Sequence, residues 1–229
     1  GIDRIVNACA SLESLKDTEA LMEKYPFVYG AFGIHPDDAD KMTEETLEEI
    51  RKLCKLPKAV AVGEIGLDYY WHKEEHEHEI QKKMFRAQME IAREAQMPFM
   101  IHSREAAKDT LDIVKDCMKG GMYGGIIHCF SYAKEMAREY LDMGLYLGIG
   151  GVVTFKNAKK LKEVVEYAPL DQIVLETDSP YLSPEPNRGK RNDSRNLVYV
   201  AREIARIKGV TEDEVIAVTE GNAERLLLR

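Results

Sequence analysis

The chain has 229 residues, of which 45% are hydrophobic and 31% charged, and its formal net charge is −8. This composition is ordinary for a soluble globular protein, and no run approaches the eighteen or so apolar residues that a membrane span needs. The negative charge argues against a protein that coats nucleic acid non-specifically, so that a phosphate chain would have to be bound by a local basic patch or a metal ion.

Seven short apolar runs recur along the chain, each followed by a polar or helical stretch. Several are almost continuous in Val, Ile, Ala and Leu, which is typical of parallel strands covered on both faces. The predicted strands span residues 2–10, 27–34, 59–65, 98–102, 124–130, 145–151 and 172–178.

Helical patterns separate these runs, and Ser11 and Thr43 are predicted as N-caps of the first two helices. No linker or shift in composition divides the chain, so the alternation predicts a single α/β domain over residues 1–229 with a parallel sheet. The predicted helices span residues 11–25, 43–54, 74–96, 105–118, 133–143, 157–167, 194–208 and 212–227.

Seven strands leave two α/β architectures open. An eight-stranded barrel takes about 250 residues and needs one more strand, whereas an open doubly wound sheet can stop at seven. No G-x-G-x-x-G or P-loop motif supports the open sheet. Gly1 directly precedes the first predicted strand, as glycine often follows a helix end, and the chain has no initiator methionine. We therefore expect a (β/α)8 TIM barrel that lacks its first strand and helix.

The four cysteines, which are scattered along the chain, form no C-x-x-C pair. This spacing predicts reduced thiols in a cytoplasmic protein and argues against a disulfide framework or a zinc knuckle.

Metal-capable side chains follow five of the seven predicted strands. In parallel α/β folds the carboxyl ends of the strands carry the chemistry, and imidazole with carboxylate binds divalent metals. Taken singly, a histidine after an apolar run is more often a core or rim residue, but the shared position favours a common metal site. These residues are His35, Glu64, His102, His128 and Asp178.

A second group of histidines, His72, His76 and His78, lies in an acidic stretch at the start of a predicted helix. His72 and His76 have the i, i+4 spacing of a metal clip. The apolar stripe of the helix starts later, however, so a solvated face is the favoured interpretation. Trp71 is expected to pack under the following loop, with a place at the mouth of the site as the alternative.

Two basic stretches remain, at residues 155–160 and 183–196. The first is most simply the start of a helix with a solvated face. The second follows the Asp178 strand end, and its prolines and glycine predict a shaped loop. Guanidinium groups in such a loop suit a phosphate, and we expect Arg188 and Arg191 to contact it.

Several motifs together resemble the TatD family of metal-dependent deoxyribonucleases, in order, from about residue 2 to the C-terminus. The resemblance implies an amidohydrolase-like (β/α)8 barrel with one or two divalent metals, Mg²⁺ in use and Zn, Mn or Ni as other occupants, and 3′-to-5′ cleavage of DNA. The motifs are GIHP, VGEIGLDYYW, PFMIHSREA, GIIHCFS, LGIGGVVTFKNA and the run from VLETDSPYLSP to ARIKG.

The resemblance also implies roles for individual residues. Glu64 would bridge two metals, and His102 and His128 would bind one of them. Asp178 would be an acidic ligand that orients the nucleophilic water and accepts its proton, while His35 would lie near the substrate phosphate. Arg104, two residues after His102, is a further candidate for binding substrate.

One part of the family pattern is missing, because no H-x-H pair follows the first predicted strand. This agrees with the strand count and predicts that half of the metal site is absent, which would leave the chain weakly active or inactive. DNA is the expected partner, with no membrane and no obligatory protein partner. A small-molecule amide, lactone or phosphoester hydrolase and a non-catalytic metal-binding protein remain as alternatives.

Overall fold

The computed structural model describes residues 2–228, and within them seven strands alternate with eight α-helices. Each strand lies at one of the apolar runs that predicted it, so the prediction of seven strands is confirmed. The strands are β1 (Ile5–Ala8), β2 (Val28–Ala31), β3 (Ala59–Asp68), β4 (Phe99–Arg104), β5 (Gly125–Ile127), β6 (Tyr146–Ile149) and β7 (Ile173–Leu175).

All eight predicted helices are present, and the two predicted N-caps are confirmed. The hydroxyl of Ser11 accepts from the backbone N–H of Ser14, and that of Thr43 accepts from the N–H of Thr46, each within a reciprocal capping box. The helices are α1 (Leu12–Lys24), α2 (Glu44–Leu53), α3 (Glu75–Ala95), α4 (Ala107–Lys119), α5 (Lys134–Asp142), α6 (Lys159–Tyr167), α7 (Leu197–Lys208) and α8 (Glu212–Leu227). Short 3₁₀ helices occur as η1 (Pro36–Lys41), η2 (Gly151–Thr154), η3 (Leu170–Gln172) and η4 (Ser194–Asn196).

Internal contacts divide the chain into two compact units. The N-terminal unit is Asp3–Ile126, and the C-terminal unit contains the other described residues, with the division falling inside β5. The assignment of the chain to a single domain stays a prediction.

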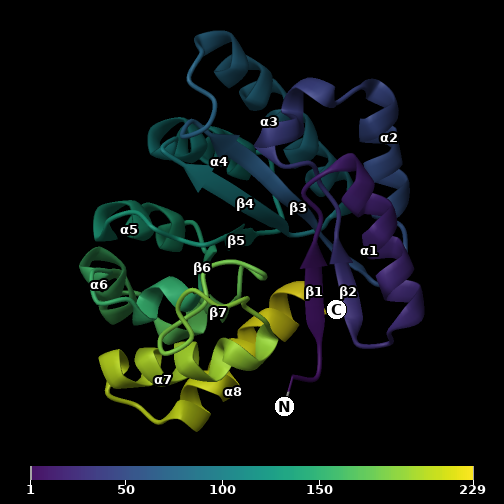
Figure 1. Ribbon diagram of the computed structural model, residues 1–229. Helices are drawn as coiled ribbons and strands as arrows, with labels where there is room; N and C mark the ends of the chain where they lie inside the picture. The colour runs from purple at the N-terminus through teal and green to yellow at the C-terminus, as the bar shows by residue number, and fades with distance from the viewer. Residues whose placement is uncertain (1, 229) are drawn as a thin grey trace. The chain divides into compact units, whose positions relative to one another are not determined.

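In the N-terminal unit, β1 to β4 are neighbours in the order of the sequence, and each pairs in parallel with the next. Helices α1 and α2 lie beside β1 and β2 (Figure 1), and α3 packs on β3. Because the strands are parallel, their carboxyl ends meet at one edge of the sheet. Side chains that follow these four strands are therefore brought together.

Glu64 lies inside β3, so the prediction that it follows the end of this strand was wrong. The pairing of β3 with β4 shifts register between Val62 and Ile65, and such an irregularity lets a strand continue past a local kink. A Cβ on Gly63 would lie 2.6 Å from Cβ of Met100, so glycine is needed where the strands approach. Every residue of β3 is buried except Glu64, which is partly exposed.

The prediction for His102 needs the same correction, because this residue also lies within its strand, β4, rather than after it. β4 continues to Arg104, two residues further than the apolar run indicated, since Ser103 and Arg104 pair with Leu67 and Asp68 at the end of β3. Polar residues can extend a strand where a neighbour supplies the hydrogen bonds.

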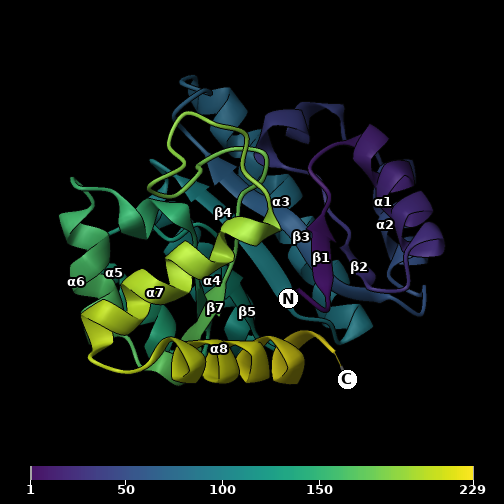
Figure 2. The ribbon, with the colours of Figure 1, turned by 60° about the horizontal axis from the view of Figure 1, so that its bottom comes forward.

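In the C-terminal unit, β6 and β7 pair in parallel, with Leu147 opposite Ile173. Helix α8 packs against β7 and α7, as Figure 2 shows. The buried amide of Asn222 in α8 donates to the carbonyl oxygens of Ile173 at 2.7 Å and Leu170 at 2.9 Å. These bonds fix the start of β7, and so the position at which its carboxyl end presents Glu176 and Asp178.

No helix within residues 2–228 is both long and apolar enough to cross a membrane. The four cysteines are free thiols, as their spacing predicted.

Candidate metal centre

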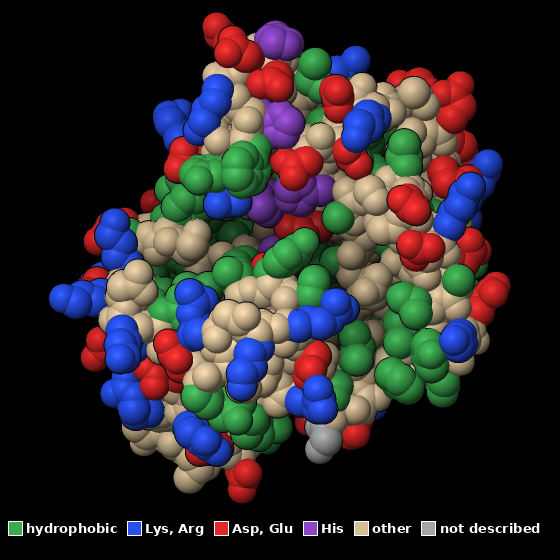
Figure 3. Space-filling view, viewed as in Figure 1, with side chains coloured by type: hydrophobic (Ala, Val, Ile, Leu, Met, Phe, Trp, Pro, Cys, Tyr) green, Lys and Arg blue, Asp and Glu red, His purple; other side chains and the backbone are tan. Residues whose placement is uncertain are grey.

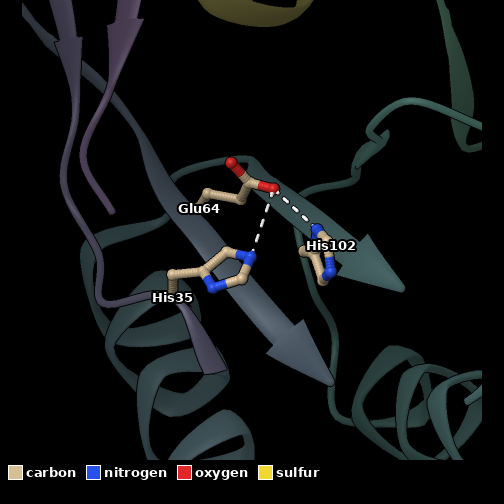
Figure 4. Close-up of side chains that lie close together, drawn as sticks. All are labelled: His35, Glu64 and His102. Atoms are coloured by element: carbon tan, nitrogen blue, oxygen red, sulfur yellow. Dashed lines mark hydrogen bonds and ion pairs between the residues drawn. The ribbon is translucent and has the colours of Figure 1, made fainter. Parts of the chain in front are cut away.

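His35, Glu64 and His102 form the first group of ligand-capable side chains, in the N-terminal unit. Figure 4 shows both imidazole rings turned toward the Glu64 carboxylate. Oε1 of Glu64 lies 3.0 Å from Nδ1 of His102 and 4.0 Å from Nε2 of His35. The two rings meet edge to face, with centroids 4.3 Å apart. Three elements, β3, β4 and the segment after β2, thus direct their donor atoms to one place.

A buried carboxylate holds the far side of His102. Nε2 of His102 lies 3.0 Å from Oδ2 of Asp68, whose side chain is only 2% exposed. Oδ1 of Asp68 accepts from the backbone N–H groups of Tyr70 at 2.9 Å and Trp71 at 3.2 Å, so the carboxylate itself is fixed. A proton held on Nε2 leaves Nδ1 of His102 available to a cation, which is the usual arrangement of a metal-binding histidine.

The surroundings of His102 also shift its pKa. Burial by itself lowers the pKa of an imidazole, but the bonds to Asp68 and Glu64 outweigh burial and raise the pKa of His102 to about 9. Without a cation the ring therefore carries a proton at neutral pH. A cation on Nδ1 would take the place of that proton.

His35 is held differently, by Asp37 of η1, whose backbone N–H donates to Nδ1 of His35 at 3.2 Å. Nδ1 of His35 lies 3.4 Å from Oδ2 of Asp37, while Nε2 faces Glu64. The bond to His35, with a further contribution from His72, lowers the pKa of Asp37 to about 2 against the effect of partial burial. Each histidine of this group thus has a carboxylate behind it.

His128, Cys129 and Glu176 form the second group, in the C-terminal unit. Nδ1 of His128 lies 2.8 Å from Oε2 of Glu176. The backbone N–H of Cys129 donates to both oxygens of Glu176, at 3.0 and 3.1 Å. Cys129 takes the left-handed conformation (φ 44°), which costs a non-glycine residue on the order of 1–2 kcal/mol. Local strain of this size is common where a side chain or N–H is aimed for function.

Asp178 lies beyond the end of β7 and faces the other nitrogen of His128. Its Oδ1 is 3.3 Å from Nε2 of His128, and its side chain is 32% exposed. His128 directly follows β5, as predicted, and it forms an ion pair with Asp178. Glu64 and His102 form the corresponding pair in the other unit, and the sharing of one cation by all four residues stays a prediction.

The predicted substrate-binding arginines lie at the surface of the two units. Arg104 ends β4 opposite Asp68, so it lies at the strand edge that carries His102. Arg188 stacks on Phe155, with Cζ 3.6 Å from the ring centroid, and this contact joins the two basic stretches. Its loop is ordered by the buried side chains of Asn192, which donates to Thr177 O, and Ser183, which donates to Lys190 O. Arg191 of the same loop is exposed.

The second group of histidines is only partly solvated, so the predicted solvated face holds for His76 alone. His72 lies 3.2 Å from both Asp37 and Glu77, and His78 stacks on Tyr69 with ring centroids 3.6 Å apart. His72 and His76 line a cavity of about 200 Å³ beside η1. Across residues 2–228, the groups of three or more side chains spaced for one ion are those of His35 and His128, and neither includes His72.

The donor atoms of the His35 group suit a divalent cation. One atom from each side chain lies within 4.8 Å of the other two, as metal–ligand distances of about 2.0–2.2 Å allow. Two imidazole nitrogens and one carboxylate favour Zn²⁺, Mn²⁺ or a related transition ion, because Mg²⁺ prefers oxygen ligands. The acidic and histidine side chains gathered in the upper half of Figure 3 fit a surface that attracts cations.

Three carboxylates of these groups were missed at the level of sequence. Glu176 directly follows β7 and stands two residues before Asp178, so its position after a strand could have identified it. Asp68 follows an apolar run, but its bond to His102 depends on strand pairing that no local pattern reveals. Asp37 could not be identified for a similar reason, because its position beside His35 depends on the turn that follows His35.

Comparison with known proteins places the chain in a family. The model of the family described as TatD related DNase matches residues 1–228. A metal-dependent hydrolase of Bacillus subtilis, YabD, whose function is uncharacterised, is 45% identical over 226 residues, which cover 98% of this chain and 87% of that protein. The 3′-5′ ssDNA/RNA exonuclease TatD of Citrobacter rodentium is 32% identical, with 99% of this chain and 87% of that protein covered.

Among solved structures, the TatD homologue YJJV of Escherichia coli K12 superposes with a TM-score of 0.91 at 27% identity. The match covers 99% of this chain and 87% of that one. The expected fold class is therefore confirmed as a TIM-like (β/α) barrel. With the full-length family match and the two relatives, it follows that the chain belongs to the TatD family of metal-dependent hydrolases.

Proposed function

We propose that this chain hydrolyses phosphodiester bonds in DNA, removing nucleotides from the 3′ end with a divalent metal as cofactor. The observation that carries the proposal is the His35–Glu64–His102 group, whose three donor atoms are spaced for one cation. A relative that shares 32% identity is named a 3′-5′ ssDNA/RNA exonuclease, which supports nucleic acid as the substrate.

The His35–Glu64–His102 group is assigned the role of binding a cation that polarises the substrate. A divalent cation there would supply Lewis-acid chemistry, lowering the pKa of water and drawing charge from a phosphoryl oxygen. Glu64 supplies the negative charge that holds the cation, and Asp68 keeps the His102 ring in the tautomer that presents Nδ1. The resemblance to the family favours Mg²⁺, whereas the nitrogen-rich donor set favours Mn²⁺ or Zn²⁺, so both kinds of ion belong in the test.

Asp178 is assigned the role of general base. Its carboxylate is partly exposed, so a water molecule can reach it, and its hydrogen bond to His128 orients it. A carboxylate in this position accepts the proton that an attacking water loses.

The arginines are assigned the role of offsetting the negative charge of the phosphate. Arg188 lies over Phe155, with Cζ 3.6 Å from the ring centroid, and Arg191 lies three residues further in the same ordered loop. Planar guanidinium groups donate two parallel hydrogen bonds to phosphate oxygens.

The test is digestion of a 5′-labelled single-stranded oligonucleotide after removal of metal and after return of Mg²⁺, Mn²⁺ or Zn²⁺. We expect no cleavage without metal and a ladder that shortens from the 3′ end with it. An oligonucleotide blocked at its 3′ end should resist. Asp178→Asn should abolish the ladder, whereas the control Asp171→Asn, an exposed aspartate in the same unit, should leave it intact.

A wild-type-like ladder from Asp178→Asn would remove the role given to that residue. Metal-dependent hydrolysis of a chromogenic phosphodiester that single-stranded DNA does not inhibit would instead indicate a small-molecule hydrolase. Metal binding without any turnover would indicate a non-catalytic protein.

A further inference from the structure

An exposed pair of aromatic rings lies directly beyond the carboxyl end of β3. Tyr70 and Trp71 follow Asp68, the last residue of the strand, and Arg104 stands opposite Asp68 at the end of β4. All three residues therefore lie at the carboxyl ends of the two strands that carry Glu64 and His102. Sequence reasoning expected Trp71 to pack under the following loop, and this was wrong, because the residue is 64% exposed.

The three side chains form one surface. The rings of Tyr70 and Trp71 meet at 85° with centroids 4.7 Å apart. The guanidinium carbon of Arg104 lies 4.0 Å from the Tyr70 centroid and 5.7 Å from that of Trp71, and Nζ of Lys73 lies 5.2 Å from Tyr70. In the upper half of Figure 3, hydrophobic and basic side chains lie at the surface beside histidines.

The backbone beneath these rings is rigid. Oδ1 of Asp68 accepts from the N–H groups of Tyr70 and Trp71, while Oδ2 of the same carboxylate holds His102. The side-chain amide of Gln81 in α3 further fixes Asp68, because it accepts from the backbone N–H of Asp68 and donates to the backbone carbonyl of Asp68. One buried carboxylate thus ties the aromatic surface to the candidate metal ligand, and a rigid surface loses little entropy on binding.

Exposed aromatic rings with adjacent cations suit nucleobases. Every base presents a π face, and stacking on an aromatic side chain is worth about 1–3 kcal/mol per base. A cation beside the rings adds attraction for the phosphate chain, which a protein of net charge −8 needs locally. An interior base of a duplex has both faces covered by its neighbours and cannot stack here, whereas an unpaired base can.

We propose that Tyr70, Trp71 and Arg104 form a stacking surface that binds an unpaired base of a single-stranded nucleic acid beside the Glu64–His102 pair. The inference rests on the proposed function for its substrate class, and adds to it the site at which a base is held. It predicts a preference for single strands over duplex.

The experiment uses the intrinsic fluorescence of Trp71, which is the one tryptophan of the chain, as a reporter of stacking. The protein is titrated with a twelve-nucleotide oligo(dT) and with an abasic strand of equal length and charge, both in EDTA and in Ca²⁺. We expect oligo(dT) to quench the emission saturably and the abasic strand to bind at least tenfold more weakly. Equal affinities for the two strands, or no quenching by oligo(dT) in either buffer, would overturn the proposal.

Variants separate stacking from general loss of the fold. Fluorescence anisotropy of labelled oligo(dT) should show a roughly tenfold weaker Kd for Tyr70→Ala and for Trp71→Ala. The matched control is Phe27→Ala. Phe27 is exposed and pairs with Tyr25, which has a lysine nearby, but both residues precede β2 at the opposite edge of the sheet. An equal loss in Phe27→Ala would contradict the proposal. Quenching without any metal-dependent cleavage would refute the proposed hydrolysis and leave the stacking surface standing.

Discussion

The two ligand groups differ in what stands behind their histidines. In the N-terminal unit, His102 is backed by the buried carboxylate of Asp68, which accepts from two backbone N–H groups, and the Gln81 amide makes two hydrogen bonds to the backbone of Asp68. In the C-terminal unit, His128 lies between two carboxylates, and one of them, Asp178, is 32% exposed. A buried partner fixes a ligand, whereas an exposed partner can reach water. This difference agrees with the roles proposed above, a cation held by the first group and a proton accepted by Asp178 beside the second.

The largest effect is expected from Glu64→Gln. The amide removes the charge that faces His35 and His102, so metal affinity should fall strongly and metal-dependent hydrolysis should fall on the order of 10³-fold, since a metal supplies several kcal/mol of stabilisation. Titration calorimetry with Mn²⁺ and an oligonucleotide assay measure the two quantities. Glu49→Gln, at an exposed position of α2, is the control. Unchanged Mn²⁺ affinity in Glu64→Gln would contradict the cation-binding role of the first group.

The next effect separates Asp68→Asn from Asp178→Asn. Loss of a carboxylate behind a metal-binding histidine typically costs 10–100-fold in metal affinity, so Asp68→Asn should weaken Mn²⁺ binding by about that factor. An asparagine oxygen can still accept from Tyr70 and Trp71, so the turn should persist. Asp178→Asn should lower kcat with a smaller change in Mn²⁺ affinity. If Mn²⁺ affinity fell in Asp178→Asn alone, the roles assigned to the two groups would have to be exchanged.

A smaller effect is expected from Gly148→Ala in β6. Its Cβ would lie 2.2 Å from Oε2 of Glu176, and the flexible end of that side chain would have to move away from the Cys129 N–H. We expect activity to fall about tenfold, for a displaced interaction worth about 1.4 kcal/mol, with little change in stability because the clash is relieved locally. Gly221→Ala, in α8 with open space around it, is the matched control and should be neutral or up to about 1 kcal/mol more stable. Full activity in Gly148→Ala would show that the position of Glu176 is unimportant.

The smallest effect is expected from removing a charge that lies outside both ligand groups. Bonds to Arg206 and Lys162 lower the pKa of Glu203 to about 2 against the effect of partial burial. A depressed pKa means stability that is present above about pH 4.5 and is lost as the pH falls toward 2. Glu203→Gln should therefore cost roughly 1 kcal/mol at pH 7, after allowance for solvent screening.

Urea unfolding at pH 7 and at pH 3 measures this difference, which should shrink at the lower pH. Glu163→Gln, on the exposed face of α6, should show no such trend. If the difference in unfolding free energy between wild type and Glu203→Gln grew on acidification, the assigned cause would be contradicted. If Glu203→Gln lost as much hydrolytic activity as Glu64→Gln, charge removal anywhere would disable the enzyme.

Much of the fold was predictable because its signals are local. Apolar runs marked all seven strands, and Ser11 and Thr43 marked two helix starts through side-chain bonds to residues three positions away. The ends of β3 and β4 were placed too early, since a strand that contains Glu64 or His102 is stabilised by its neighbour and by a register shift that no single run displays.

The candidate sites divide in the same way. Position after or within a strand identified Glu64, His102, His128 and Asp178 as metal-capable, and the motifs around them identified the family. Glu176 could have been found from its position directly after β7. Asp68 could not, because its role depends on a hydrogen bond to a residue 34 positions away.

By itself, then, the sequence determined the order of strands and helices, the helix caps, the family and the residue types available to a metal. Periodicity and short-range hydrogen bonding act within a few residues, so they can be read directly along the chain. Only the tertiary structure decided that Asp68 backs His102, that Glu176 joins His128, and that Trp71 stands in solvent beside Arg104. These contacts join residues from different strands and turns, and their geometry exists only once the elements have packed together.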